Sequence, residues 1–260
     1  MSNQRPYISP SQITRFLNEP ALWVVEKLYN VRGDAGPKAW RGSACEAAAD
    51  KVLFDDGATD ADALAAAHDR FDAECQGEVR DDIDKSRAEL PLYLANLLPS
   101  LRKIKSERGA PIERQARIEL ELPDINAIVI GYADWVWQDG GLDLKTVARM
   151  PSFDEASGRI KDKADHLRQM AIYAQAKGRP FSLLYATPGK QKEPRLYPVG
   201  DDEAAKAMRQ VVAAARAMDR ILTRPLAERD HVAAAYPPRD LDNFIWDEKT
   251  RAKACEIWGL

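Results

Sequence analysis

The sequence has few of the residues and segments that mark several large classes of protein. Its 260 residues include three cysteines, Cys45, Cys75 and Cys255, and no C-x-x-C pair. These widely spaced cysteines predict neither a disulfide framework nor a zinc site. No apolar run approaches the ~20 residues that a membrane-spanning helix needs, and the first residues lack the apolar stretch of a signal peptide. We therefore expect a cytoplasmic protein, with no membrane partner and with reduced cysteines.

Internal repeats, low-complexity tracts and a strong excess of one charge are missing too. Apolar residues make up 45% of the chain and charged residues 30%, which is ordinary for a globular protein and too apolar for a disordered one. The length suits one domain over residues 1–260. The net charge of −3 excludes a surface that is basic throughout, but the charge is segregated. Residues 46 to 84 hold thirteen acids and three bases, whereas residues 101 to 117 hold six bases and two acids, so the second segment is either a solvated helix face or a track for phosphate groups.

Capping and turn signals predict an α/β fold with a mainly helical first part. Ser9-Pro10-Ser11-Gln12 has the pattern of a capping box, which predicts that a helix begins there. Further helices are expected at 21–28, 40–54, 60–75, 86–108 with a break near Pro91 or Pro99, 164–177 and 202–222. Strands are expected at 115–121, 125–137, 141–147, 182–186 and 195–199, the first three as an antiparallel meander. We accordingly expect a helical region at 1–110, a mixed sheet with flanking helices at 111–225, and a tail at 226–260 that is tethered to the domain.

The second and third expected strands form a hairpin that gathers charged residues. If Asp139-Gly140 is its two-residue loop, Asp134 lies opposite Lys145, and Val136 lies opposite Asp143. Because side chains alternate along a strand, Asp134, Asp143 and Lys145 then share one face. Two interpretations remain open for this face: a cross-strand ion pair on the surface, or two carboxylates that hold Mg²⁺ beside a lysine that orients water.

The hairpin resembles a known family when it is taken together with two motifs that precede it in the chain and one that follows it. The hairpin contributes Gly131-Tyr132-Ala133-Asp134 and Asp143-Leu144-Lys145; the other marks are Ser9-x-Ser11 with Phe16 and Glu19-Pro20, then Gly42-x-x-x-Glu46, and lastly Gln169-x-x-x-Tyr173. Together they resemble the PD-(D/E)XK nuclease superfamily, specifically its RecB-like exonuclease branch. Each mark is weak alone, so the order of the four carries the resemblance. It implies a restriction-endonuclease-like core with a central mixed β-sheet.

The resemblance also implies roles for individual residues. Asp134, Asp143, Glu46 and the backbone carbonyl of Leu144 would bind Mg²⁺, for which Mn²⁺ is a possible substitute, and Lys145 would position the attacking water. Gln169 and Tyr173, one turn apart, would orient the lysine or a DNA phosphate. The side chains expected to contact DNA are His166, which could equally be a buried hydrogen-bonding residue, and the basic residues Arg102, Lys103, Lys105, Arg114 and Arg117.

Departures from the family pattern narrow these expectations. Ala133 stands in place of the proline in the superfamily's name, and Glu46 stands in place of a histidine, which favours a more acidic metal site. Glu19 replaces the cysteine before Pro20, so we predict no iron–sulfur cluster. Pro188-Gly189-Lys190 lacks the upstream glycine and the hydroxyl residue of a phosphate-binding loop, so we expect no ATP-driven motor in this chain.

The sequence therefore predicts a magnesium-dependent DNA nuclease, most simply an exonuclease that acts on linear ends in recombination, repair or DNA degradation in a bacterium or phage-infected cell. A single-strand annealing protein or a helicase is the expected kind of partner. Two alternatives stay open: an endonuclease of the same fold, and a catalytically silent DNA-binding or assembly module. The endonuclease is less favoured because no zinc finger or helix-turn-helix is recognisable.

Overall fold

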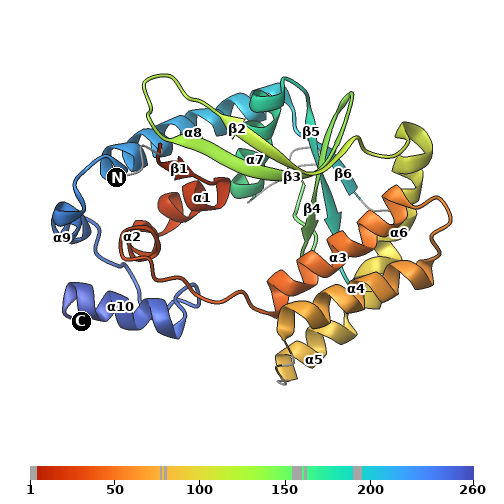
Figure 1. Cartoon of the computed structure of the whole chain (residues 1–260), viewed down its shortest axis with the longest axis horizontal. Helices are drawn as coiled ribbons and strands as arrows, with labels where there is room; N and C mark the ends of the chain where they lie inside the picture. The colour runs from red at the N-terminus through yellow and green to blue at the C-terminus, as the bar shows by residue number, and fades with distance from the viewer. Residues whose placement is uncertain (1–4, 77, 79–80, 154–159, 161–162, 190–194) are drawn as a thin grey trace.

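A computed structural model describes residues 5–260 except 77, 79–80, 154–159, 161–162 and 190–194. Figure 1 shows a mixed sheet with helices on both of its faces, as the sequence predicted. The strands are β1 Tyr7–Ile8, β2 Glu113–Leu120, β3 Ile128–Trp137, β4 Gly140–Thr146, β5 Phe181–Ala186 and β6 Arg195–Pro198. The helices are α1 Pro10–Asn18, α2 Pro20–Leu28, α3 Pro37–Phe54, α4 Asp60–Cys75, α5 Asp81–Ala88, α6 Leu90–Arg108, α7 Ala164–Lys177, α8 Asp201–Leu222, α9 Arg229–Ala234 and α10 Glu248–Trp258, with a short 3-10 turn η1 at Leu226–Glu228.

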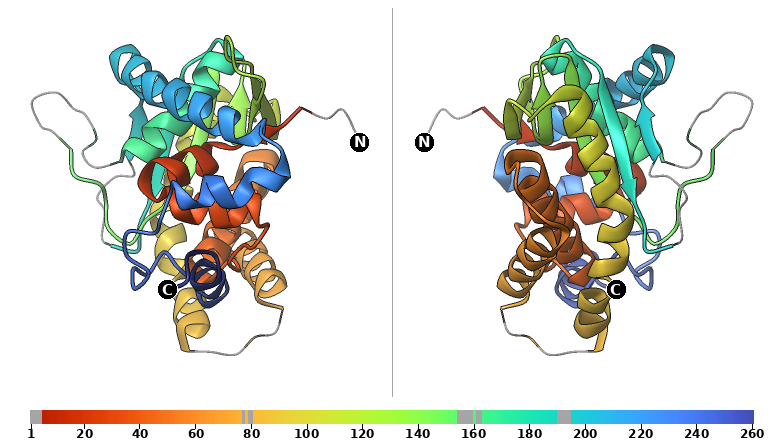
Figure 2. Two further views of the ribbon diagram at one scale, coloured as in Figure 1. Left: turned by 90° about the vertical axis from the view of Figure 1, so that its left-hand side faces the viewer. Right: turned by 90° about the vertical axis from the view of Figure 1, so that its right-hand side faces the viewer.

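The sheet has the order β1-β3-β4-β5-β6, with β2 on the other edge of β3. β2 and β4 pair antiparallel with β3, which confirms the predicted meander, whereas β1 joins β3 and β5 joins β4 in parallel. Helices α3 to α6 cover one face, and Figure 2 shows α6 lying along β5. Helices α1, α7 and α8 lie on the opposite face.

Local signals explain where the first helices begin. Ser9 caps α1: its Oγ accepts the N–H of Gln12 at 3.2 Å, and the Gln12 side chain accepts the N–H of Ser9 at 3.1 Å. The expected helix at 86–108 is divided, because α5 ends at Ala88 and α6 starts at Leu90. Pro91 lies in the first turn of α6, where the missing N–H costs nothing, but Pro99 lies inside the helix without ending it. Of the two proposed breaks, the one near Pro91 is thus confirmed.

Two hydrophobic clusters lie on either side of β3. On the α7 and α8 side, Val136 packs into the larger cluster. On the α3 to α6 side, Trp135 and Trp137 pack into the second. Trp135 is anchored by its indole N–H, which donates to Asp50 Oδ1 of α3 at 2.7 Å. Strand β3 is therefore buried from both faces at its C-terminal end, and this fixes the position of Asp134 between the clusters.

The predicted register of the β3–β4 hairpin is wrong by two residues. The structure pairs Trp137 with Gly140, so that the loop is Gln138-Asp139 rather than Asp139-Gly140. Gly140 is the first residue of β4, and a side chain would not fit there, because a Cβ would lie 2.5 Å from the carbonyl oxygen of Pro180. A shift of two leaves every side chain on its predicted face. It moves Lys145 away from Asp134, however, and brings Asp134 level with Asp143.

The sheet divides at this hairpin. β3 pairs with β4 only over residues 135–137 and with β1 only over residues 128–129, and both partners lie on the edge opposite β2. Between them, residues 130–134 of β3 have no strand partner on that edge among the residues that the structure describes. β4 continues instead along β5, from Gly141 to Thr146. The resulting split in the sheet opens directly beside Asp134.

The C-terminal part is more regular than the expected tail. α9 and α10 form here, and α10 packs beside α2, with Trp246 and Ala254 buried against Leu22. Within the described residues, no helix is both long and apolar enough to span a membrane.

Candidate nuclease site

Asp134 and Asp143 lie at the fork where β3 and β4 separate. The last pair of the β3–β4 ladder joins Trp135 to Leu142, so each aspartate is the first residue beyond it. There Asp134 Oδ2 accepts the backbone N–H of Leu144 at 2.7 Å. A side-chain oxygen thus takes the place of the missing strand partner, as a buried N–H requires. The two carboxylates are nearly inaccessible, with Asp134 exposed by 7% and Asp143 by 1%.

Lys145 lies two residues after Asp143 on the same face of β4. Its ammonium forms an ion pair with Asp143 Oδ2, and its side chain is 21% exposed. The predicted partnership of Lys145 with Asp134 across the hairpin is replaced by this contact within β4. Burial alone would lower the pKa of Lys145, but the charges of Asp143 and Asp134 outweigh burial and raise it. The lysine therefore carries a full positive charge at neutral pH and is partly open to the solvent.

Glu46 reaches the same place from α3. The helix passes close to β4 at Gly42, where a Cβ would make ordinary van der Waals contact with Thr146 Oγ1 at 3.6 Å. A longer side chain would push α3 away from the strand. The Gly42-x-x-x-Glu46 spacing therefore places a glycine at the contact and the carboxylate one turn further along the helix, beside the aspartates.

Gln115 of β2 is a site residue that the sequence reasoning missed. Its Nε2 donates to Glu46 Oε2 and to Asp134 Oδ1, each at 3.2 Å, and so links two elements that are distant in sequence. Its backbone is left-handed, with φ 45°, a conformation that costs a non-glycine residue energy and is concentrated at functional sites. The β2–β3 register places it opposite Asp134. That register was the only available signal, and it depends on pairings that a single sequence does not reveal.

Gln169 and Tyr173 of α7 complete the constellation from the opposite face. Gln169 Nε2 donates to Asp143 Oδ1 at 3.2 Å and to Tyr173 Oη at 2.7 Å, and Tyr173 Oη donates in turn to the carbonyl of Tyr132 at 2.6 Å. Gly131 makes room for this arrangement, because a Cβ on it would lie 2.8 Å from Cε1 of Tyr173. The predicted one-turn pair therefore contacts Asp143 and the β3 backbone, and within the described part of the chain Gln169 forms no hydrogen bond with Lys145.

The three carboxylates repel one another strongly. Burial, followed by the charge of Asp143, raises the pKa of Glu46 to about 7. Burial and the charges of Asp143 and Glu46 raise the pKa of Asp134 well above its ordinary value, and burial also raises the pKa of Asp143 against the opposing charge of Lys145. One ammonium does not balance three acids in a buried cluster. The cluster consequently has a deficit of positive charge.

A divalent cation is the group that fits this deficit. Carboxylate oxygens are the ligands that Mg²⁺ prefers, and Glu46, Asp134 and Asp143 supply them from α3, β3 and β4. The three carboxylates are neighbours but are not spaced as metal ligands: within the described residues, no three acidic, histidine or cysteine side chains form a ready-made metal cluster. Protein donors occupy the oxygens instead, namely Gln115, the Leu144 N–H, Lys145 and Gln169. Metal binding would therefore require these contacts to rearrange.

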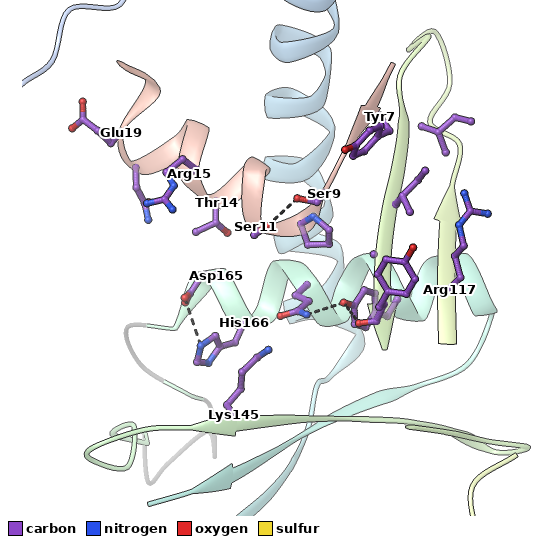
Figure 3. A pocket seen from close by; sticks show the side chains of 18 of the residues that line it. Tyr7, Ser9, Ser11, Thr14, Arg15, Glu19, Arg117, Lys145, Asp165 and His166 are labelled. Atoms are coloured by element: carbon purple, nitrogen blue, oxygen red, sulfur yellow. Dashed lines mark hydrogen bonds and ion pairs between the residues drawn. The ribbon is translucent and has the colours of Figure 1, made fainter. Parts of the chain in front are cut away.

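A cavity of about 1280 Å³ opens onto the site, lined by α1, α7 and the strands around the split. Figure 3 shows Lys145 and His166 on one side of this cavity and the α1 residues Ser11, Thr14 and Arg15 on the other. His166 Nδ1 lies 2.8 Å from the Tyr185 hydroxyl, and burial lowers its pKa to about 4. The imidazole is thus neutral at pH 7. Of the two interpretations of His166, the hydrogen-bonding residue agrees better with this geometry.

The predicted DNA contacts fall into two groups. Arg117 lines the cavity, but Arg102, Lys103, Lys105 and Arg114 do not. Three of these pair with the acidic segment identified in the sequence: Arg102 with Asp60 at 2.6 Å, Lys105 with Asp56 at 2.7 Å, and Arg114 with Asp50 at 3.7 Å. Lys103 lies 4.0 Å from Glu107. The segregated charges therefore largely neutralise each other, while the cavity gains Arg5 and Arg15, which the sequence reasoning did not single out.

The opening motif also lies at the cavity. Ser9, Ser11 and Glu19 are among its lining residues, and Ser9 Oγ and Ser11 Oγ are 2.8 Å apart. Phe16 is buried on α1 and packs edge-on against Trp23, with ring centroids 5.1 Å apart. The polar residues of the Ser-x-Ser segment thus face the site, whereas the aromatic residue anchors the helix to the core.

Comparisons with known proteins agree with this geometry. The family model described as "PD-(D/E)XK nuclease superfamily" matches residues 7–252. The crystal structure of a protein from Eubacterium rectale, provisionally described as an exonuclease, aligns with a TM-score of 0.54 at 17% identity, covering 83% of this chain and 80% of that one. The crystal structure of SSO0001 aligns less well, with a TM-score of 0.31 at 16% identity, covering 64% of this chain and 82% of that one. No curated protein matches the sequence.

The first of these structures supports the fold, and the family match spans nearly the whole chain and contains all four motifs. The restriction-endonuclease-like sheet expected from the sequence is confirmed. The chain belongs to the PD-(D/E)XK nuclease superfamily.

Proposed function

We propose that this protein is a magnesium-dependent deoxyribonuclease of the RecB-like branch, and that it degrades linear DNA from an end. The observation that carries the proposal is the convergence of Glu46, Asp134, Asp143 and Lys145 from three separate elements into one buried cluster at the cavity. A surface ion pair, the alternative to a metal site, would not bury two aspartates beside a third carboxylate, because that arrangement is costly without a cation.

The residues divide the chemistry among them. Glu46, Asp134, Asp143 and the Leu144 carbonyl would hold Mg²⁺, with Mn²⁺ as a possible substitute, and the bound ion would supply charge to a phosphodiester oxygen and activate water. Lys145 is the one cluster residue with a mobile positive group that reaches the cavity, so it positions the attacking water and stabilises charge that develops on the phosphate. Gln169 holds Asp143 in place, and Tyr173 ties Gln169 to the β3 backbone. Both act as positioning residues.

An exonuclease is favoured over an endonuclease by the shape of the site. Asp143 is 1% exposed and lies behind its partners Lys145 and Gln169, which line a cavity bounded by α1 and α7. A strand end can enter such a recess, whereas the middle of a duplex presents a broad convex surface. The Eubacterium rectale protein that shares the fold also carries an exonuclease description. Recombination, repair or DNA degradation are the processes proposed for such an activity, and an annealing protein or a helicase is the proposed partner.

The decisive assay compares substrates and metals. Purified protein is incubated with end-labelled linear DNA and with closed circular DNA of the same sequence, in Mg²⁺, in Mn²⁺ and in EDTA. We expect degradation of the linear substrate alone, and only with a metal. Cleavage of the circle would replace the exonuclease by the endonuclease alternative.

Two variants separate an enzyme from a silent DNA-binding module. Asp143→Asn and Lys145→Met should abolish degradation while the protein remains folded, because both groups belong to the metal and water machinery. Lys249→Met is the matched control, since Lys249 is 61% exposed in an ion pair outside the cavity. Absence of metal-dependent cleavage on linear single- and double-stranded DNA by the wild-type protein would support the silent module.

A further inference from the structure

We propose that the cavity receives an unpaired DNA strand and that Tyr132 is the surface on which a base of that strand stacks. This inference rests on the proposed nuclease function and names the form of its substrate. The juxtaposition that carries it is an exposed aromatic ring on β3, two residues before Asp134, in the lining of the cavity that leads to Lys145.

The ring belongs to a stripe of apolar side chains on one face of the sheet. Ile128, Ile130 and Tyr132 alternate along β3, and all three line the cavity. Tyr7 of β1 pairs with Ile128 and extends the stripe at its far end. The two tyrosines are 49% and 53% exposed, for Tyr7 and Tyr132 respectively, although the rings of most other tyrosines in the described residues are buried or half-buried. The Lys27 ammonium lies over the Tyr7 ring, 4.3 Å from its centroid, so Tyr132 is the ring that the stripe offers to a planar ligand.

Tyr132 is held rigidly to the catalytic cluster. Its carbonyl accepts a hydrogen bond from the Tyr173 hydroxyl. That hydroxyl accepts a hydrogen bond from the side-chain amide of Gln169, and the same amide also donates to Asp143. Three hydrogen bonds therefore connect Asp143 to the backbone of Tyr132. Within the described residues, no aromatic or cationic side chain stacks on the Tyr132 ring, so a face of it remains available.

The charges around the stripe suit a phosphate backbone. Arg117 pairs across the strands with Tyr132, so the two side chains project from the same face, and Arg5, Arg15 and Lys145 also line the cavity. Two lining acids, Glu19 and Asp165, oppose these four bases, and each base also pairs with an acid outside the lining: Arg5 with Glu121, Arg15 with Glu26, Arg117 with Glu119 and Lys145 with Asp143. The exposed pairs are weak, so a phosphate can compete for Arg5, Arg15 and Arg117. Arg117 is 54% exposed and lies beside Tyr132 on the neighbouring strand. Aromatic rings interleaved with basic groups are the arrangement by which proteins bind single strands without reading their sequence.

A paired strand fits this arrangement poorly. The bases of a duplex are stacked on each other, so the Tyr132 ring would find a free base face only at the very end or in an unpaired overhang. The cavity volume, about 1280 Å³, exceeds the roughly 300–1,000 Å³ of most small-molecule pockets, which agrees with a few nucleotides rather than with one small ligand. We therefore infer that the substrate is a single strand or a duplex whose end has been opened.

The test measures binding in EDTA, where no cleavage occurs. Fluorescence anisotropy compares a labelled oligothymidylate with a blunt duplex of the same length, for the wild-type protein, Tyr132→Ala, Tyr132→Phe and Leu196→Ala. Leu196 is the control because it is similarly exposed, at 48%, on a strand outside the cavity. We expect the wild-type protein to prefer the single strand, and Tyr132→Ala to lose roughly tenfold or more of that affinity. Tyr132→Phe and Leu196→Ala should bind as the wild-type protein does.

A second measurement does not depend on any variant. An oligonucleotide with 2-aminopurine near its end should lose fluorescence when the wild-type protein binds it, because stacking on the ring quenches the base. Unchanged fluorescence in the bound state, equal affinity for the blunt duplex, or full single-strand affinity of Tyr132→Ala would overturn the proposal. If the wild-type protein stacks and binds the strand yet never cleaves DNA with Mg²⁺, the strand inference stands and the nuclease function fails.

Discussion

The carboxylate of Asp134 accepts the backbone N–H of Leu144 at 2.7 Å, just beyond the point where the ladder between β3 and β4 ends. One oxygen of this residue therefore completes the backbone of the neighbouring strand, and the other accepts the amide of Gln115. Asp134 has both a structural and a chemical role, and substitutions can separate the two.

Asp134→Asn should abolish activity while stabilising the metal-free protein. The amide keeps an oxygen for the Leu144 N–H but removes one of three repelling charges, so we expect a higher melting temperature in EDTA at pH 8 and at least about a 100-fold loss of cleavage. Asp134→Ala removes the acceptor as well and leaves a buried N–H unpaired, which costs about 1–3 kcal/mol. The melting temperature of Asp134→Asn should therefore be higher than that of Asp134→Ala. Equal melting temperatures would show that the bond to Leu144 contributes little.

Lys145→Met should lower both activity and stability. Asp143 is 1% exposed, and the substitution leaves its charge buried without a counterion, which costs on the order of 3–5 kcal/mol. Protonation of Asp143 relieves that cost, so the loss of stability should be larger at pH 8 than at pH 5. Cleavage should fall by about 100- to 1,000-fold. Lys249→Met breaks an exposed ion pair, so the free energy of unfolding measured in urea should change by no more than about 1 kcal/mol. A pH-independent loss in Lys145→Met would contradict the ion-pair explanation.

The stability of the metal-free protein should fall as pH rises from 4.5 to about 7, because the pKa of Glu46 rises between these values on folding. In that window the folded protein holds more protons than the unfolded chain, so raising the pH favours unfolding. Bound Mg²⁺ favours the deprotonated acid, so its affinity should rise with pH up to about 7 and then level off. Calorimetric titration and thermal melts measure both effects. Glu46→Gln should weaken the dependence of the melting temperature on pH. An unchanged dependence in this variant would show that other groups cause it.

Two substitutions test the role of the Gln115 side chain separately from that of its left-handed backbone. Gln115→Ala loses the donor shared by Glu46 and Asp134 but keeps the left-handed backbone, whereas Gln115→Gly loses the donor and relieves the strain. We expect glycine to be more stable than alanine by about 1–2 kcal/mol. Both should bind Mg²⁺ with altered affinity, which calorimetry measures directly. Equal stability of the Gln115→Ala and Gln115→Gly proteins would show that the φ of 45° costs no free energy at this position.

Local features of the fold could be predicted because short-range physics determines them. The Ser9 capping box, the alternation of polar and apolar residues along β3, and the one-turn spacing of Gln169 and Tyr173 each depend on neighbours in sequence. The sequence therefore indicated which elements carry the candidate site residues. These signals also placed Asp134 and Lys145 on their correct faces.

Long-range contacts explain what could not be predicted. The register of the hairpin depends on Pro180, whose carbonyl approaches Gly140, and on the ion pair of Arg108 with Asp139 in the loop. The role of Gln115 depends on the β2–β3 pairing. The neutralisation of the basic segment depends on the packing of α6 against α3 and α4, which brings Arg102 to Asp60. A single sequence contains no record of these pairings.

Strand β3 is also the partition between the two hydrophobic clusters: Val136 faces one of them, and Trp135 and Trp137 face the other. Glu46 approaches the site from the second cluster and Gln169 from the first. The distances between the acidic residues therefore depend on the side-chain packing within each cluster. Substitutions deep in either cluster, far from DNA and metal, can tune the catalytic geometry, so activity in this protein is sensitive to the interior of the molecule as well as to its cavity.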